Sequence, residues 1–67
     1  MGAGEWYIEK ANAQKEYDSE IISREKYELR TKYAIRMIYK CGNKNDKAAA
    51  KRMAKSHGYS IEELIRM

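Results

Sequence analysis

The sequence predicts one all-α domain over residues 1–67, a small bundle of three to four helices with a C-terminal helix-turn-helix-like hairpin. The 67-residue chain has no proline and no glycine between Gly4 and Gly42. That long stretch is rich in Glu, Lys, Arg and Ala, which favour helix over strand. A chain of this length buries only about 60% of its unfolded surface, so we expect a thin core.

The first two helices are expected over about residues 5–18 and 23–40. Apolar side chains of the first follow one stripe at helical spacing: Trp6, Ala13, Tyr17 and Ile21. Ser23 is the predicted N-cap of the second helix, because a serine hydroxyl accepts a hydrogen bond from a free N–H of the first turn. The expected core face of that helix consists of Tyr27, Ala34, Ile35, Ile38 and Cys41.

Residues 27–41 also alternate like a β-strand, which makes an α+β fold with a strand at 27–41 the alternative. Odd-numbered positions are apolar or β-compatible and even-numbered ones are mostly charged, a period of two. A single strand over this whole segment would be long against the usual range of about 3–10 residues, and no turn residue divides it into a hairpin. We therefore predict a helix here.

The last third of the chain predicts two short helices joined by a tight turn. The first starts near Asn45 or Asp46 and ends at Gly58, since glycine takes the left-handed C′ conformation without a Cβ clash. Ser60 and Glu63 match the S-x-x-E capping box of a following helix. On the first of these helices the apolar arc is Ala49, Ala50, Met53, Ala54 and His57, and the opposite arc is Ala48, Lys51, Arg52 and Lys55.

The spacing of Ala54 and Gly58 resembles that of DNA-binding helix-turn-helix motifs, which place a small residue four positions before the turn glycine. The segment after the turn differs where such a motif reads bases. It presents Glu62 and two isoleucines, whereas a groove lined with phosphates is bound by Arg, Lys, Asn and Gln. We expect a hairpin that closes the bundle rather than a base-reading helix.

Charge changes sign along the chain beneath a net charge of +4. Residues 1–23 have a net charge of −3, residues 24–40 of +4, residues 41–56 of +4 and residues 57–67 of −1. One interpretation is that segments of opposite sign pack side by side within the bundle. The other is a basic surface for nucleic acid or an acidic protein.

The sequence contains few of the side chains that catalysis or metal binding requires. One histidine, one cysteine and two aspartates provide neither a convincing triad nor four zinc ligands, and His57 lies on an apolar arc. We predict a non-enzymatic protein without cofactor or metal. We expect a cytoplasmic protein without membrane contact for three reasons. Cys41 is the single cysteine, no apolar run approaches about 20 residues, and the N-terminus has no apolar signal-peptide core.

Basic residues of the second and third helices are the candidate binding site. Our leading hypothesis is contact with nucleic acid or a nucleoprotein, mainly through phosphates, with Tyr33 stacking on a base. The alternative is a small inhibitor or adaptor, of the kind that phages and mobile elements encode, that binds a protein. A homodimer paired through its Tyr/Met face is a third possibility. The candidate residues are Lys26, Arg30, Tyr33, Lys40, Lys51, Arg52 and Lys55.

Overall fold

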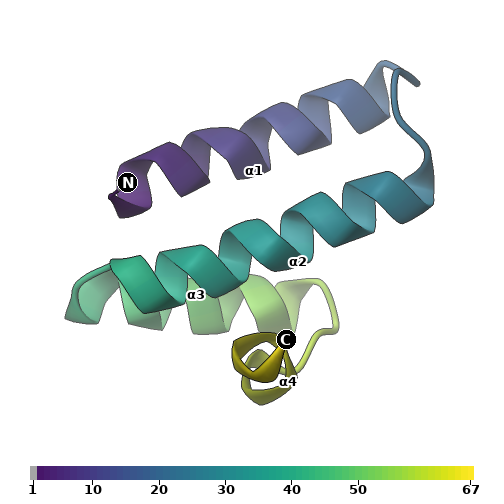
Figure 1. Ribbon diagram of the computed structural model, residues 1–67. Helices are drawn as coiled ribbons and strands as arrows, with labels where there is room; N and C mark the ends of the chain where they lie inside the picture. The colour runs from purple at the N-terminus through teal and green to yellow at the C-terminus, as the bar shows by residue number, and fades with distance from the viewer. Residues whose placement is uncertain (1) are drawn as a thin grey trace.

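The computed structural model describes residues 2–67, which form four helices and no strand. They are α1 (Ala3–Asp18), α2 (Arg24–Cys41), α3 (Lys44–Ser56) and α4 (Ile61–Arg66). Helix α2 is central: α1 runs antiparallel to it on one side, and α3 and α4 pack on the other (Figure 1). The predicted all-α bundle is confirmed, and the alternative strand at 27–41 is wrong because this segment lies wholly within α2.

Helix α1 ends at Asp18 in a Schellman turn that sequence reasoning did not anticipate. The N–H of Ile21 donates to the carbonyl of Glu16 at 2.8 Å, and the N–H of Glu20 donates to that of Tyr17 at 3.0 Å. Glu20 takes the left-handed conformation, with φ 60°. The turn carries Ile21 out of the helical stripe, so its side chain is 70% exposed and its predicted place on the buried face is wrong.

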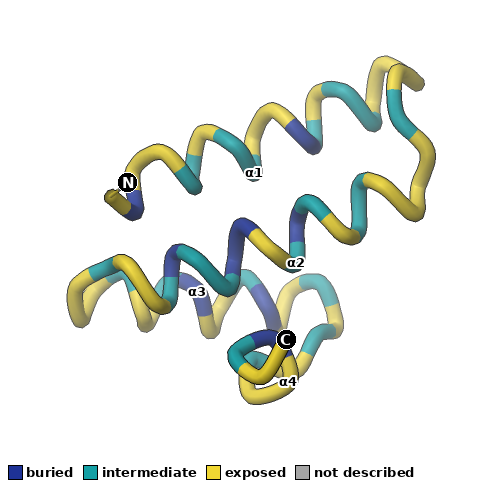
Figure 2. The backbone as a smooth tube through the Cα atoms, viewed as in Figure 1, coloured by how far each residue is buried: buried dark blue, intermediate teal, exposed yellow. Residues whose placement is uncertain are grey.

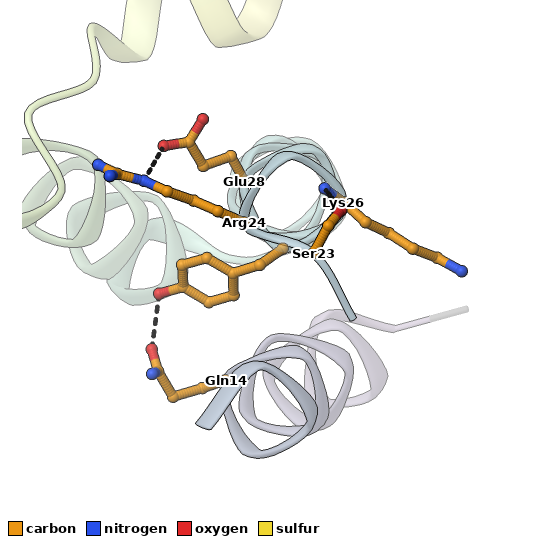
Figure 3. Close-up of polar contacts among 6 residues, drawn as sticks. Gln14, Ser23, Arg24, Lys26 and Glu28 are labelled. Carbon is orange, nitrogen blue, oxygen red and sulfur yellow. Dashed lines mark hydrogen bonds and ion pairs between the residues drawn. The ribbon is translucent and has the colours of Figure 1, made fainter. Parts of the chain in front are cut away.

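Helix α2 starts as predicted at an N-cap serine, whose hydroxyl accepts from the N–H of Lys26 at 3.2 Å (Figure 3). Nearby, the Tyr27 hydroxyl donates to Oε1 of Gln14 on α1 at 2.6 Å. The predicted core positions Ala34, Ile35 and Ile38 are buried.

Cys41 is exposed instead of buried. It lies eight positions beyond Tyr33, which contacts Trp6 near the start of α1. Cys41 is the last residue of α2, directly before the turn into α3.

The α2–α3 connection is a two-residue turn whose geometry depends on Gly42 and Asn43. A Cβ at position 42 would overlap the Cβ of Asp46 and lie 2.5 Å from the carbonyl oxygen of Ile38, so only glycine fits. Asn43 is the N-cap of α3: its Oδ1 accepts from the N–H of Asp46 at 3.0 Å, and Oδ2 of Asp46 accepts from the N–H of Asn43 at 3.0 Å. This reciprocal capping box starts α3 at Lys44, one to two residues earlier than we expected.

The α3–α4 turn is closed by glycine as predicted. Gly58 has φ +77°, and the N–H of Tyr59 donates to the carbonyl of Ala54 at 2.8 Å. Ser60 occupies the N-cap position of α4, but its side chain makes no capping hydrogen bond. The predicted box with Glu63 is therefore wrong; both residues are exposed, where water competes for the hydroxyl and the carboxylate.

The core lies where α2, α3 and α4 meet, and Figure 2 shows buried positions on the facing sides of the helices. Its members are Ile35, Ile38, Ala50, Ala54 and Leu64. Trp6 and Tyr7 of α1 pack against this cluster, and the Tyr7 hydroxyl donates to Oδ1 of Asp46 at 3.0 Å. Ala50 and Ala54 let α3 approach α2 closely, so α3 buries small side chains and turns its long cationic ones outward.

Candidate functional site

Helix α3 presents a row of cations to solvent, which we call the α3 basic face: Lys44, Lys47, Lys51, Arg52 and Lys55. All five are exposed. Ala50 and Ala54 direct the opposite side of the helix into the core, so the row follows from the same periodicity that builds the core. The one acidic residue of α3, Asp46, is half-buried in the capping box and accepts from Tyr7. The outward side of α3 therefore carries positive charge alone.

None of the ion pairs among residues 2–67 involves the α3 basic face. Those pairs join Arg24 to Glu28, and Arg30 to Glu9 and Glu16. Lys47 has a partner of another kind, since its Nζ lies 5.3 Å from the ring centroid of Tyr39 on α2. The remaining four cations of the α3 basic face form no ion pair with any residue in the part of the chain that the structure describes.

Arg30, a candidate contact residue, is instead a bridge between α1 and α2. Its Nη2 lies 2.7 Å from Oε1 of Glu9 and its Nη1 2.9 Å from Oε2 of Glu16, and its Nε donates to Oε1 of Glu9 at 2.8 Å. These hydrogen bonds raise the pKa of Arg30 above its ordinary value. Glu9 and Glu16 are seven residues apart on one side of α1, a spacing that places both carboxylates on one face but does not by itself name Arg30 as their partner.

Lys26 and Lys40 lie near opposite ends of α2 and are exposed. The Lys26 side chain points away from the neighbouring helices in Figure 3. At a rise of 1.5 Å per residue, about 21 Å of helix separates the two lysines. Lys40 lies two residues before the turn into α3, whereas Lys26 lies near the other end of α2.

Tyr33 lies on the outward side of α2 and is 45% exposed, but its ring is already in contact. The Trp6 ring meets it edge-on, with centroids 5.3 Å apart at 73°. Cζ of Arg36 lies 5.7 Å from its centroid. The site therefore does not gather the seven candidates: Lys51, Arg52 and Lys55 share α3, and the α2 candidates divide among separate environments.

Sequence reasoning missed Leu29, whose side chain is 57% exposed. It precedes Tyr33 by one helical turn, so the two lie on one side of α2. We call Lys26, Leu29, Tyr33 and Lys40 the α2 outer stripe. Leu29 belongs to the alternating pattern of residues 27–41. That pattern fits one face of a strand as well as the exposed side of a helix, so it did not single out Leu29.

His57 sits at the C-cap of α3, half-buried and stacked on Tyr59 with ring centroids 5.5 Å apart. Burial lowers its pKa below the ordinary value of 6.5, and the nearby charge of Lys10 lowers it further. Within residues 2–67, no three His, Cys, Asp or Glu side chains gather where they could hold a metal ion. An open pocket of about 370 Å³ lies beside this turn, with Lys32 and Glu63 in its lining.

Comparison with known proteins adds no relative: no family model, curated protein or solved structure matches this chain. Across the described residues, no helix combines the length and the apolar character needed to cross a bilayer.

Proposed function

We propose that this protein binds nucleic acid through the α3 basic face, mainly by contacts to phosphate oxygens. The observation that carries the proposal is the exposed row of Lys44, Lys51, Arg52 and Lys55, which has no ion-pair partner among residues 2–67. Uncompensated cations on a rigid helix attract a polyanion and release its condensed counterions on binding. Lys40 extends the row across the α2–α3 turn.

Three of the original candidates leave the proposed contact set. Tyr33 is in contact with Trp6 and Arg36. The guanidinium of Arg30 is occupied by Glu9 and Glu16. Lys26 lies far along α2 from the α3 basic face. The acidic residues of α1 thus neutralise part of α2, while the positive charge of α3 stays available for a ligand.

Salt dependence tests the proposal. Four phosphate contacts give a slope of about −3.6 in log affinity against log salt, or a loss of about 100-fold between 50 and 200 mM. Fluorescence anisotropy with a labelled 20-base-pair DNA duplex measures this slope. The triple variant K51Q/R52Q/K55Q removes three contacts and should make the slope shallower by about 2.7.

The matched control K15Q/R24Q/R66Q removes the same charge from exposed positions outside α3. It should keep the slope of the wild type within one unit. Equal losses in the two triple variants would mean that net charge alone, and not the α3 basic face, holds the ligand. A slope near zero for the wild type would refute the proposal.

A second candidate function, a protein-binding inhibitor or adaptor, is favoured by the α2 outer stripe. Leu29 and Tyr33 are 57% and 45% exposed and lie one turn apart. Aromatic and apolar side chains at the centre of a patch are typical of protein contacts. Capture of one stoichiometric partner that survives nuclease treatment and is lost in Leu29→Glu would favour it. Light scattering distinguishes this function from self-association through the same stripe.

A further inference from the structure

We infer that the ligand of the α3 basic face is double-stranded, bound through its phosphate backbone without base stacking. This inference rests on the proposed function and names its substrate class. Proteins that hold single strands combine a basic groove with aromatic faces on which bases stack, at about 1–3 kcal/mol per base. A single-strand site on this chain would therefore need an aromatic ring with a free face.

Tyr33, the exposed aromatic ring, is engaged within the protein. The edge-on contact with Trp6 and the guanidinium of Arg36 occupy its surroundings. Nη1 of Arg36 also lies 3.5 Å from Sδ of Met37, a weak acceptor. A base stacking where Arg36 lies over the Tyr33 ring would have to displace the guanidinium, and the gain from stacking there would be offset by the loss of that contact.

The other aromatic side chains have partners too. Tyr17 and Tyr27 stack on each other at 4.5 Å and 12°. Tyr59 stacks on His57 and lies under Nζ of Lys32 at 5.0 Å. The remaining two are Tyr39, which faces Lys47, and Tyr7, which packs against the core. The aromatic residues of this chain thus serve its own packing, and the α3 basic face itself contains none.

The helix that carries the α3 basic face has a defined cap at both ends, which fixes the spacing of its backbone positions. The helix is fixed at one end by the Asn43–Asp46 capping box and at the other by Gly58. Lys44, Lys51 and Lys55 span about 16 Å along it at 1.5 Å per residue. A duplex presents phosphates at fixed positions and high charge density, whereas a single strand must lose conformational freedom to follow the same row.

Counterion release gives the size of the preference. Each phosphate contact contributes about 0.9 to the salt slope on a duplex but about 0.7 on a single strand. For four contacts the two slopes differ by about 0.8. If the two affinities are taken as equal at about 1 M salt, the duplex binds about tenfold tighter at about 50 mM.

The test is anisotropy at about 50 mM salt with a labelled 20-base-pair DNA duplex and with labelled (dT)20, an unstructured strand whose bases are free to stack on a protein side chain. The duplex should bind at least tenfold tighter, and Tyr33→Leu, checked for helicity by circular dichroism, should leave both affinities within twofold. Equal or tighter binding of (dT)20, or its weakening by Tyr33→Leu, would overturn this inference while leaving the proposed function intact. Binding of neither probe would instead refute the proposed function itself.

Discussion

Replacing Arg30 by Met should destabilise the fold by about 1–2 kcal/mol. The guanidinium makes charge-assisted contacts of 2.7–2.9 Å with Glu9 and Glu16, and its side chain is 23% exposed. A fully exposed ion pair contributes about 0.2–1 kcal/mol and a hydrogen bond to a charged group about 1.5–3 kcal/mol. Since the two carboxylates are about one-third exposed, water screens the pairs and the combined effect lies between these limits.

Thermal unfolding followed by circular dichroism at 222 nm measures this effect. A domain of this size shifts its Tm by about 4–8 °C per kcal/mol, so Arg30→Met should lower Tm by about 4–16 °C. The loss is large against a total stability of about 3–5 kcal/mol. Methionine keeps an apolar stem against α1, so the variant removes charge and hydrogen bonds more than packing.

Arg24→Met is the matched control on the same helix. Arg24 reaches Glu28 at 3.4 Å with its side chain 79% exposed, and its loss should cost less than about 0.5 kcal/mol. If Arg30→Met destabilised no more than Arg24→Met, the bridge would not hold α1 to α2. Because Arg30 lies outside the proposed contact set, the variant should also retain wild-type duplex affinity below its Tm.

Three further predictions concern the ends of helices. Glu20→Gly should raise the stability by about 1 kcal/mol, because glycine adopts the left-handed conformation without Cβ strain; an unchanged or lowered urea midpoint would contradict the φ of 60°. Asn43→Ala should lower it by about 1 kcal/mol through loss of the capping box, whereas Ser60→Ala should be nearly neutral in the same titration; equal effects would be contrary to the observed caps. Because the pKa of His57 is lowered in the folded protein, the unfolded chain binds a proton at this residue at a higher pH than the folded chain does. The free energy of unfolding therefore keeps the full contribution of neutral His57 above about pH 6.5, and loses it as pH falls below that value. His57→Gln or Lys10→Gln should flatten this part of the stability–pH curve, and a wild-type curve that already rises on acidification would show the sign to be wrong.

The helices were predictable because their signals are continuous along the chain. Residues 24–41 lack glycine and proline and are rich in helix-forming residues, which outweighed the alternation of period two. That alternation arose because Leu29, Tyr33 and Met37 follow the outward rim of a helix. The buried positions Ala34, Ile35 and Ile38 follow from the helical period alone.

Helix ends and ion pairs were not predictable to the same degree, since both depend on contacts away from the periodic stripe. Ile21 and Cys41 continue the apolar period in the sequence, but the left-handed Glu20 takes Ile21 out of its helix, and Cys41 is exposed at the end of α2. The role of Arg30 required knowing which side of α1 faces α2. By contrast, Lys51 and Lys55 could be placed correctly on the outward side of their helix, because Ala50 and Ala54 fix its buried side.

The outward side of α3 is the binding surface that we propose. Amide chemical-shift mapping by ¹H–¹⁵N NMR, during titration with an unlabelled DNA duplex, tests it residue by residue. We expect the largest shifts over residues 44–55 and at Lys40, with residues 11–18 of α1 unchanged. Shifts centred on Leu29 and Tyr33, or spread evenly over all four helices, would contradict the claim.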